Sequence, residues 1–133
     1  MAELIKIRTE KTPLEVIVKV KENASDFGFI VRDVFDMAKQ FSEHGVRVEE
    51  FEYYSIMLCN PEKAYKTIVS DPQRGAVLLP PKQVVVYKED GQTVMAYMAL
   101  AGDDVRKMLP GDEAFQLGLA SSCNKIIELM EGV

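Results

Sequence analysis

The sequence predicts an α+β fold, a mainly antiparallel sheet with helices packed on one face. Extended segments rich in apolar residues alternate along the chain with segments whose apolar residues recur at helical spacing. A two-residue turn, Asp90-Gly91, joins two of the extended segments as a hairpin. The expected order of elements is β-α-β-(α)-β-α-β-β-α. The 133 residues, 47% of them apolar, suit one core, so a single domain over residues 1–133 is expected.

The first expected elements are a short strand at residues 3–9 and a helix at residues 13–25. The run Val16-Ile17-Val18-Lys19-Val20 favours a strand by propensity alone. Its start, Thr12-Pro13-Leu14-Glu15, has the pattern of a helix capping box with proline at the first helical position. Because a cap satisfies donors that a strand does not leave free, we predict a helix that ends near Asp26.

The next expected elements are a strand at residues 29–34, a short helix at residues 36–44 that Gly45 closes, and a long strand at residues 46–58. Within this long strand the apolar residues change parity, from Val46 and Val48 to Phe51, Tyr53 and Met57. Such a change predicts a bulge or a bend near Glu49-Glu50.

Asn60-Pro61-Glu62 predicts the start of another helix, and Asp71-Pro72 its end. Ala64, Tyr65, Ile68 and Val69 would form its apolar face. Residues 76–79 are expected to be extended, and the doubled proline at 80–81 indicates an edge or a kink.

The predicted hairpin pairs residues 83–89 with residues 92–100, and places Tyr87 opposite Val94 and Val84 opposite Tyr97. Both faces of this ribbon are then apolar, so each face needs a cover. A short helical segment at 103–109 and a long helix at 112–131 follow. The apolar stripe of the long helix consists of Phe115, Leu119, Cys123, Ile126, Ile127 and Met130.

The segment Cys59-Asn60-Pro61-Glu62-Lys63-Ala64-Tyr65, followed by Asp71-Pro72 and Leu78-Leu79-Pro80, resembles the domain-of-unknown-function 302 family. The Phe27-Gly28-Phe29 turn and the strand Val84-Val85-Val86-Tyr87 support the resemblance, which extends from about Ile5 to Met130. It implies a TATA-binding-protein-like α+β fold and a homodimer, with no established activity. The fold likeness does not imply DNA binding, because function depends on sites and this chain is acidic.

Charge and composition exclude several classes of partner. Sixteen basic and 21 acidic residues give a net charge of −5, and the basic residues do not cluster, so nucleic acid is not expected as a partner. No apolar run reaches the ~18 residues of a membrane span, and the first residues lack the pattern of a secretion signal. Two cysteines do not form a disulfide framework, which favours a cytoplasmic location.

Cys59 is the candidate catalytic residue. It ends an apolar strand directly before the Asn60 cap, where a helix N-terminus would favour the thiolate. The alternative is a small buried residue at the end of a core strand. Cys123, within the stripe of the last helix, is expected to be a core residue.

An aromatic group around the same strand forms a candidate ligand site. Phe51, Tyr53, Tyr54 and Tyr65 could line a pocket between strand and helix, together with Met57 and Cys59. The candidate ligand-binding residues are Tyr53, Met57, Cys59, Asn60 and Tyr65. An aromatic stripe of this kind more often belongs to the core or to a dimer interface.

No metal and no cofactor are expected. His44 is the only histidine, and a straight strand would hold it far from Cys59. Adjacent strand residues such as Glu49 and Glu50 point to opposite faces and cannot share a proton, whereas Asp103-Asp104 suits a helix cap.

The sequence therefore predicts a cytoplasmic homodimeric module that binds a small molecule or a protein partner. The alternative is a thiol-dependent redox or sulfur-transfer protein that uses Cys59. No motif specifies a reaction, so the residues leave open whether the chain is an enzyme.

Overall fold

The computed structural model describes all 133 residues, and its strands form one sheet in the order β1-β5-β4-β3-β2 with every neighbouring pair antiparallel. The strands are β1 (Glu3–Thr9), β2 (Ile30–Asp36), β3 (Tyr53–Cys59), β4 (Gln83–Glu89) and β5 (Gln92–Ala99). The helices are α1 (Pro13–Asn23), α2 (Met37–Glu43), α3 (Pro61–Ser70), α4 (Gly75–Leu78), α5 (Gly102–Met108) and α6 (Glu113–Glu131). The predicted α+β fold is thus confirmed.

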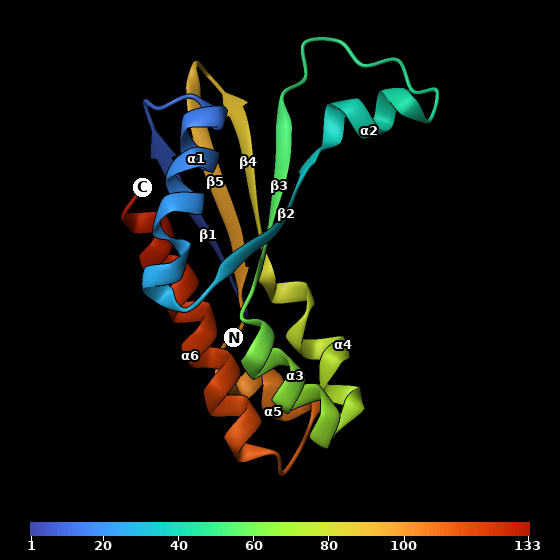
Figure 1. Ribbon diagram of the computed structural model, residues 1–133, viewed down its shortest axis with the longest axis vertical. Coiled ribbons are helices and arrows are strands. Elements are labelled where there is room, and N and C mark those ends of the chain that lie inside the picture. The colour runs from blue at the N-terminus through green and yellow to red at the C-terminus, as the bar shows by residue number, and fades with distance from the viewer.

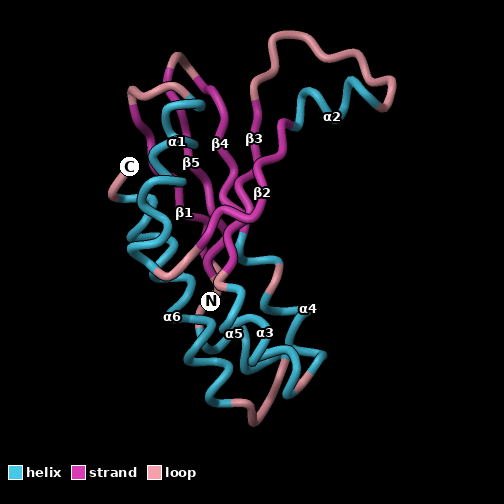
Figure 2. Tube along the Cα trace, viewed as in Figure 1, coloured by secondary structure: helices cyan, strands magenta, loops and turns pink.

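The helices divide into three groups around the sheet. α1 and α6 lie side by side on one face, whereas α3, α4 and α5 gather at the end of the sheet where β3 runs into α3 (Figure 1). α2 projects away from the body on the ribbon of β2 and β3, which Figure 2 shows as an arm that ends in a long loop. No helix has both the length and the apolar character needed to cross a membrane.

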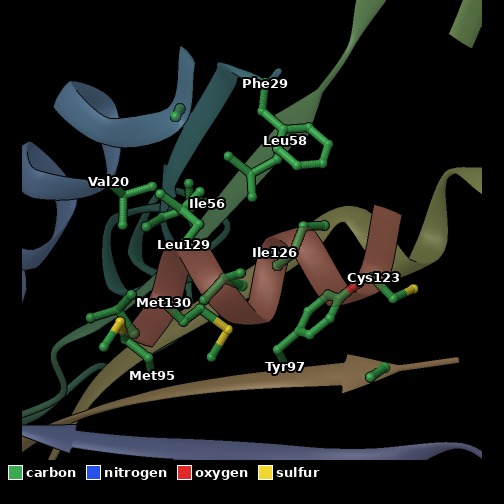
Figure 3. Packing of buried hydrophobic residues seen from close by; sticks show 14 of the residues in the cluster. Val20, Phe29, Ile56, Leu58, Met95, Tyr97, Cys123, Ile126, Leu129 and Met130 are labelled. Atoms are coloured by element: carbon green, nitrogen blue, oxygen red, sulfur yellow. The ribbon is translucent and has the colours of Figure 1, made fainter. Parts of the chain in front are cut away.

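The core lies between the sheet and the two helices α1 and α6. α6 contributes Cys123, Ile126, Leu129 and Met130, which face Ile56, Met95 and Tyr97 of the sheet (Figure 3). The Tyr97 hydroxyl is directed toward α6 and donates a hydrogen bond of 2.6 Å to the carbonyl of Pro81. This bond ties the turn before β4 to the centre of the sheet.

Helix α1 begins as the capping box predicts. The Glu15 amide donates to the Thr12 hydroxyl at 3.2 Å, and the Thr12 amide donates to the Glu15 carboxylate at 3.0 Å. The β-branched residues do not prevent the helix, because Val16 and Val20 are buried against the sheet. Packing and the cap together outweigh the strand propensity of this run.

The hairpin forms in the predicted register. Tyr87 pairs with Val94, and Val84 pairs with Tyr97. Asp90 and Gly91 both have positive φ, 53° and 78°, as a two-residue turn that matches the strand twist requires.

The long strand expected at residues 46–58 was wrong in its first half. β3 begins only at Tyr53, and residues 46–52 form the loop that follows α2, with Glu50 at φ 44°. The cause is the lack of a partner, since β2 passes directly into α2 and leaves no strand beside 46–52. The irregularity in pairing lies instead in β2, between Val31 and Asp33.

Without the long strand, two pairs of residues are placed differently from the expectation. Glu49 and Glu50 do not lie on a strand, and His44 is not joined to Cys59 by a straight one. His44 nevertheless follows α2 on the arm, at the opposite end of β3 from Cys59 (Figure 1).

The segment expected to be extended at residues 76–79 is also different. It forms α4, in which the Leu79 amide donates to the Gly75 carbonyl at 3.1 Å, and the prolines that follow make a 3₁₀ turn at Pro80–Lys82. Pro81, at ψ 42°, then breaks the helical path and lets β4 begin. The predicted apolar face of α3 is half right, because Ala64 and Ile68 pack on the core but Tyr65 and Val69 are exposed.

The outer face of the sheet carries no helix, contrary to the expectation that both faces are covered (Figure 1). Val94 and Ala96 at its centre are shielded by neighbouring side chains, whereas Met98 is 47% exposed. Toward the arm this face continues as a row of stacked rings, namely Phe41, Phe51, Tyr53 and Tyr87, with successive centroids 6.1, 5.5 and 5.3 Å apart.

Candidate functional site

A cavity of about 510 Å³ opens where α3 and α4 face α6 at the end of the sheet. Four parts of the chain meet there: the turn before β2, the junction of β3 and α3, the segment from α4 to β4, and the first half of α6. Its apolar walls are formed by Phe27, Phe29, Met57, Leu58, Ala64, Leu78, Leu79, Pro80, Ala114, Phe115 and Leu119.

Two glycines help to shape this cavity. Gly28 has φ 82°, a conformation that side chains rarely adopt, and it turns the chain between Phe27 and Phe29, which both line the walls. Gly118 lies within α6, and a Cβ atom placed there would meet no atom within 4 Å. The side chain missing at position 118 therefore leaves part of the cavity empty.

The cavity is lined by five basic residues and by no acidic one: Arg32, Lys63, Arg74, Lys82 and Lys125. Only Arg74 is neutralised, since its guanidinium donates to both carboxylate oxygens of Asp112 at 2.7 and 3.0 Å. A chain with a net charge of −5 thus concentrates positive charge at one place, which corrects the expectation that its basic residues do not cluster.

Lys82 is the exceptional member of this group, because only 7% of its surface is exposed. Its ammonium forms no hydrogen bond and no ion pair with the protein, and the Phe29 ring lies 5.7 Å away. Burial lowers the pKa of Lys82 from 10.5 to about 8, and the nearby Lys63 ammonium acts in the same direction, whereas the thiols of Cys123 and Cys59 oppose it. Lysine is almost never buried without a partner, which marks this position as unusual.

Cys59 lies on the wall of the cavity and is half-buried, whereas Cys123 is buried in the core. The neighbouring Asn60 caps α3 through its side-chain oxygen, which accepts from the Lys63 amide at 3.2 Å. Both cysteines are free thiols.

Of the five candidate ligand residues, the structure brings three to this cavity, namely Met57, Cys59 and Asn60. Tyr53 belongs to the ring stack on the outer face, and Tyr65 is 70% exposed on α3. The prediction that the tyrosines line a common pocket is therefore wrong, because α3 presents Ala64 rather than Tyr65 to the cavity.

Sequence reasoning missed Lys82, Phe115 and Gly118. One signal for Lys82 was available, since it is a single charged residue between Pro80-Pro81 and the apolar strand that begins after Gln83. Phe115 was assigned to the core stripe, and no local pattern showed that it borders a cavity. No group of three or more histidine, cysteine or acidic side chains is placed to hold a metal ion.

Comparisons with known proteins agree with this fold. The family model described as "Domain of unknown function DUF302" matches residues 5–125. A solved structure, described as an uncharacterized conserved DUF302 protein from Bacillus stearothermophilus, has a TM-score of 0.76 at 20% sequence identity and covers 96% of this chain and 95% of its own. No curated protein matches the chain. Because the family model spans residues 5–125 of the 133, the chain belongs to the DUF302 family.

Proposed function

We propose that the chain is a binding module for a small molecule with a largely apolar body, which enters the cavity between α3, α4 and α6. The observation that carries this proposal is the cavity itself. Its volume of about 510 Å³ lies within the range of about 300–1,000 Å³ typical of small-molecule sites. Apolar walls with a few polar groups are the usual composition of such sites.

Position 118 allows the cavity to be filled without disturbing the core. A Gly118→Phe substitution puts a ring into the empty space next to the helix, whereas Gly118→Ala changes only helix propensity. We expect Nile red, a neutral dye that fluoresces in apolar surroundings, to bind the wild type and Gly118→Ala but not Gly118→Phe. Equal dye binding by Gly118→Phe, or none by the wild type, would contradict the proposal.

A homodimer is the second part of the proposal, and the uncovered outer face of the sheet supports it. Partly exposed apolar side chains on this face adjoin the stacked rings of the arm. A second copy of the chain that packs on this face would bury the apolar side chains and the rings together. Light scattering on a sizing column is expected to give twice the mass of 15.0 kDa. Met98→Lys on the outer face should give monomers, whereas Leu14→Lys on the exposed side of α1 should not. A monomeric wild type would contradict the proposed homodimer.

The alternative function, a thiol-dependent redox or sulfur-transfer protein, is supported by the position of Cys59 on the cavity wall before α3. A ligand in the cavity would then lie beside a half-buried free thiol. Two unpaired cysteines also support the reducing cytoplasm as the location of the protein.

A further inference from the structure

We propose that the ligand of this cavity is an amphiphile with an anionic oxygen headgroup, a carboxylate or a phosphate, and that the Lys82 ammonium is its counter-ion. This inference rests on the proposed small-molecule binding and adds the charge of the ligand and the residue that recognises it.

The first support is the unpartnered state of Lys82. Burial of the Lys82 side chain removes part of the hydration of its ammonium, and the protein returns only a cation–π contact with the Phe29 ring at 5.7 Å. Lys82 is 93% shielded and lines the cavity, yet no carboxylate of the chain reaches it. An anion bound in the cavity would supply the missing partner through a charge-assisted hydrogen bond.

The second support is the charge of the whole site. Lys63, Lys125 and Arg32 are exposed at the edge of the cavity, and none of them forms an ion pair. Asp112 neutralises Arg74, and no acidic side chain is among the residues that line the cavity. The field in the cavity is therefore positive although the chain is acidic overall, which attracts anions and repels cations.

The third support concerns the body of the ligand. Phe29 lies beside the Lys82 ammonium, and Phe115, Leu119 and Leu78 line the same cavity, so half of the lining residues are apolar and favour an apolar body over a sugar. A small inorganic anion would leave most of this surface in contact with water. A headgroup joined to an alkyl or aryl body satisfies both the ammonium and the walls.

Four probes that share a ten-carbon chain separate these contributions: decanoate, decyl phosphate, 1-decanol and decyltrimethylammonium. At pH 7 we expect at least one anion to bind the wild type roughly 10- to 100-fold more tightly than 1-decanol, as a charge-assisted hydrogen bond predicts. The cation should bind least. Tighter binding of either anion supports the inference, and the stronger of the two identifies the headgroup.

Two variants of Lys82 test its role. Lys82→Met replaces the apolar stem of lysine with one of similar length and removes the charge. This variant should bind 1-decanol as well as the wild type does, but lose the preference for the anion. Lys82→Arg keeps the charge and should retain much of that preference. Thermal melts will verify that each variant folds. Gly118→Phe, which is designed to fill the cavity, provides a control that should bind none of the four probes.

The pH profile gives a second readout. The groups that face Lys82 are the thiols of Cys59 and Cys123 and the ammonium of Lys63. As the pH rises through about 8, Lys82 loses its proton and the affinity for decanoate should fall by up to tenfold per pH unit. Lys82→Arg retains both thiols, so a flat profile in this variant assigns the dependence to Lys82.

The outcomes distinguish this inference from the proposed function. If 1-decanol binds as tightly as both anions, or if Lys82→Met keeps the anion preference, the inference is wrong although the cavity still binds small molecules. If neither Nile red nor any ten-carbon probe binds the wild type, both the inference and the proposed function are wrong.

Discussion

Lys82→Met is expected to stabilise the free protein, although the position lines the proposed binding site. The wild-type chain holds an ammonium among apolar side chains with only the Phe29 ring as a partner, so folding removes part of its hydration at a cost. Methionine retains most of the apolar stem and has no charge to desolvate. A residue that weakens the fold but lines a cavity is typical of a site shaped by function.

The size of this effect follows from the pKa of Lys82. Its decrease from 10.5 to about 8 corresponds to about 3 kcal/mol, at ~1.4 kcal/mol for each pH unit. The unfolded chain keeps its proton up to about pH 10.5, and the folded chain only up to about pH 8. The unfolded state therefore binds more protons between these values, and the wild-type free energy of unfolding rises with pH there. The advantage of Lys82→Met is full below pH 8 and disappears near pH 10.5. Because the cavity is open, about 3 kcal/mol is an upper value.

Urea unfolding at pH 7 and at pH 9.5, followed by circular dichroism, measures this difference. We expect Lys82→Met to unfold at higher urea than the wild type at pH 7, and the gap to shrink by about half or more at pH 9.5. Lys125→Met, the same substitution at an exposed position on the edge of the cavity, should leave the midpoint nearly unchanged. A less stable Lys82→Met, or a gap that does not depend on pH, would refute the reasoning.

Three further predictions concern a cap, an ion pair and the two thiols. Thr12→Ala should lower the free energy of unfolding by about 1 kcal/mol through loss of the α1 cap, and an unchanged urea midpoint would contradict this. The Arg74 guanidinium holds the pKa of Asp112 below its usual range, so Arg74→Ala should be less stable than the wild type at pH 7 in thermal melts. The difference should narrow as acid protonates Asp112, although the Arg74 bonds to Thr67 and Ser70 keep part of it. A gap that does not narrow between pH 7 and pH 2 would be inconsistent. Iodoacetamide should label Cys59 faster than Cys123 in the folded protein, and a bound decanoate should slow it; equal rates, resolved by mass spectrometry, would argue against an accessible Cys59.

The parts of the fold that the sequence predicted correctly are those with local causes. The Asp90-Gly91 turn fixes the hairpin register through the conformation of two residues. The segment Thr12-Pro13-Leu14-Glu15 starts a helix through contacts among these four residues alone. The stripe on α6 is likewise visible in one stretch of chain. In each of these places the neighbours in sequence are also the neighbours that decide the structure.

The errors arose where distant partners decide. Residues 46–52 have the alternation of a strand but no strand beside them, so they form the loop of the arm. Residues 76–79 have apolar side chains that suit either a strand or a helix, and the contacts of the α3–α4 segment select the helix. The side chains of Val84 to Val86 point alternately to the two faces of the sheet, as the sequence predicts. The sequence did not show that one of these faces lacks a helix.

The candidate site was predicted in part for the same reason. Met57, Cys59 and Asn60 were found because they adjoin one another at the start of α3. Lys82 and Gly118 come from segments far apart in the chain, and their meeting depends on the packing of α6 against the end of the sheet. No spacing in the sequence predicts that a single lysine is buried without a carboxylate.

The titration of Lys82 itself, followed by NMR through its Hε–Cε signal and assigned with Lys82→Arg, tests the account most directly. In the free protein we predict a pKa of about 8, because the side chain is buried and its ammonium has no anionic partner. With decanoate bound, the pKa should rise by about one to two pH units, as a 10- to 100-fold preference of the anion for the charged lysine requires. A value near 10.4 in the free protein, or no change on adding decanoate, would contradict it.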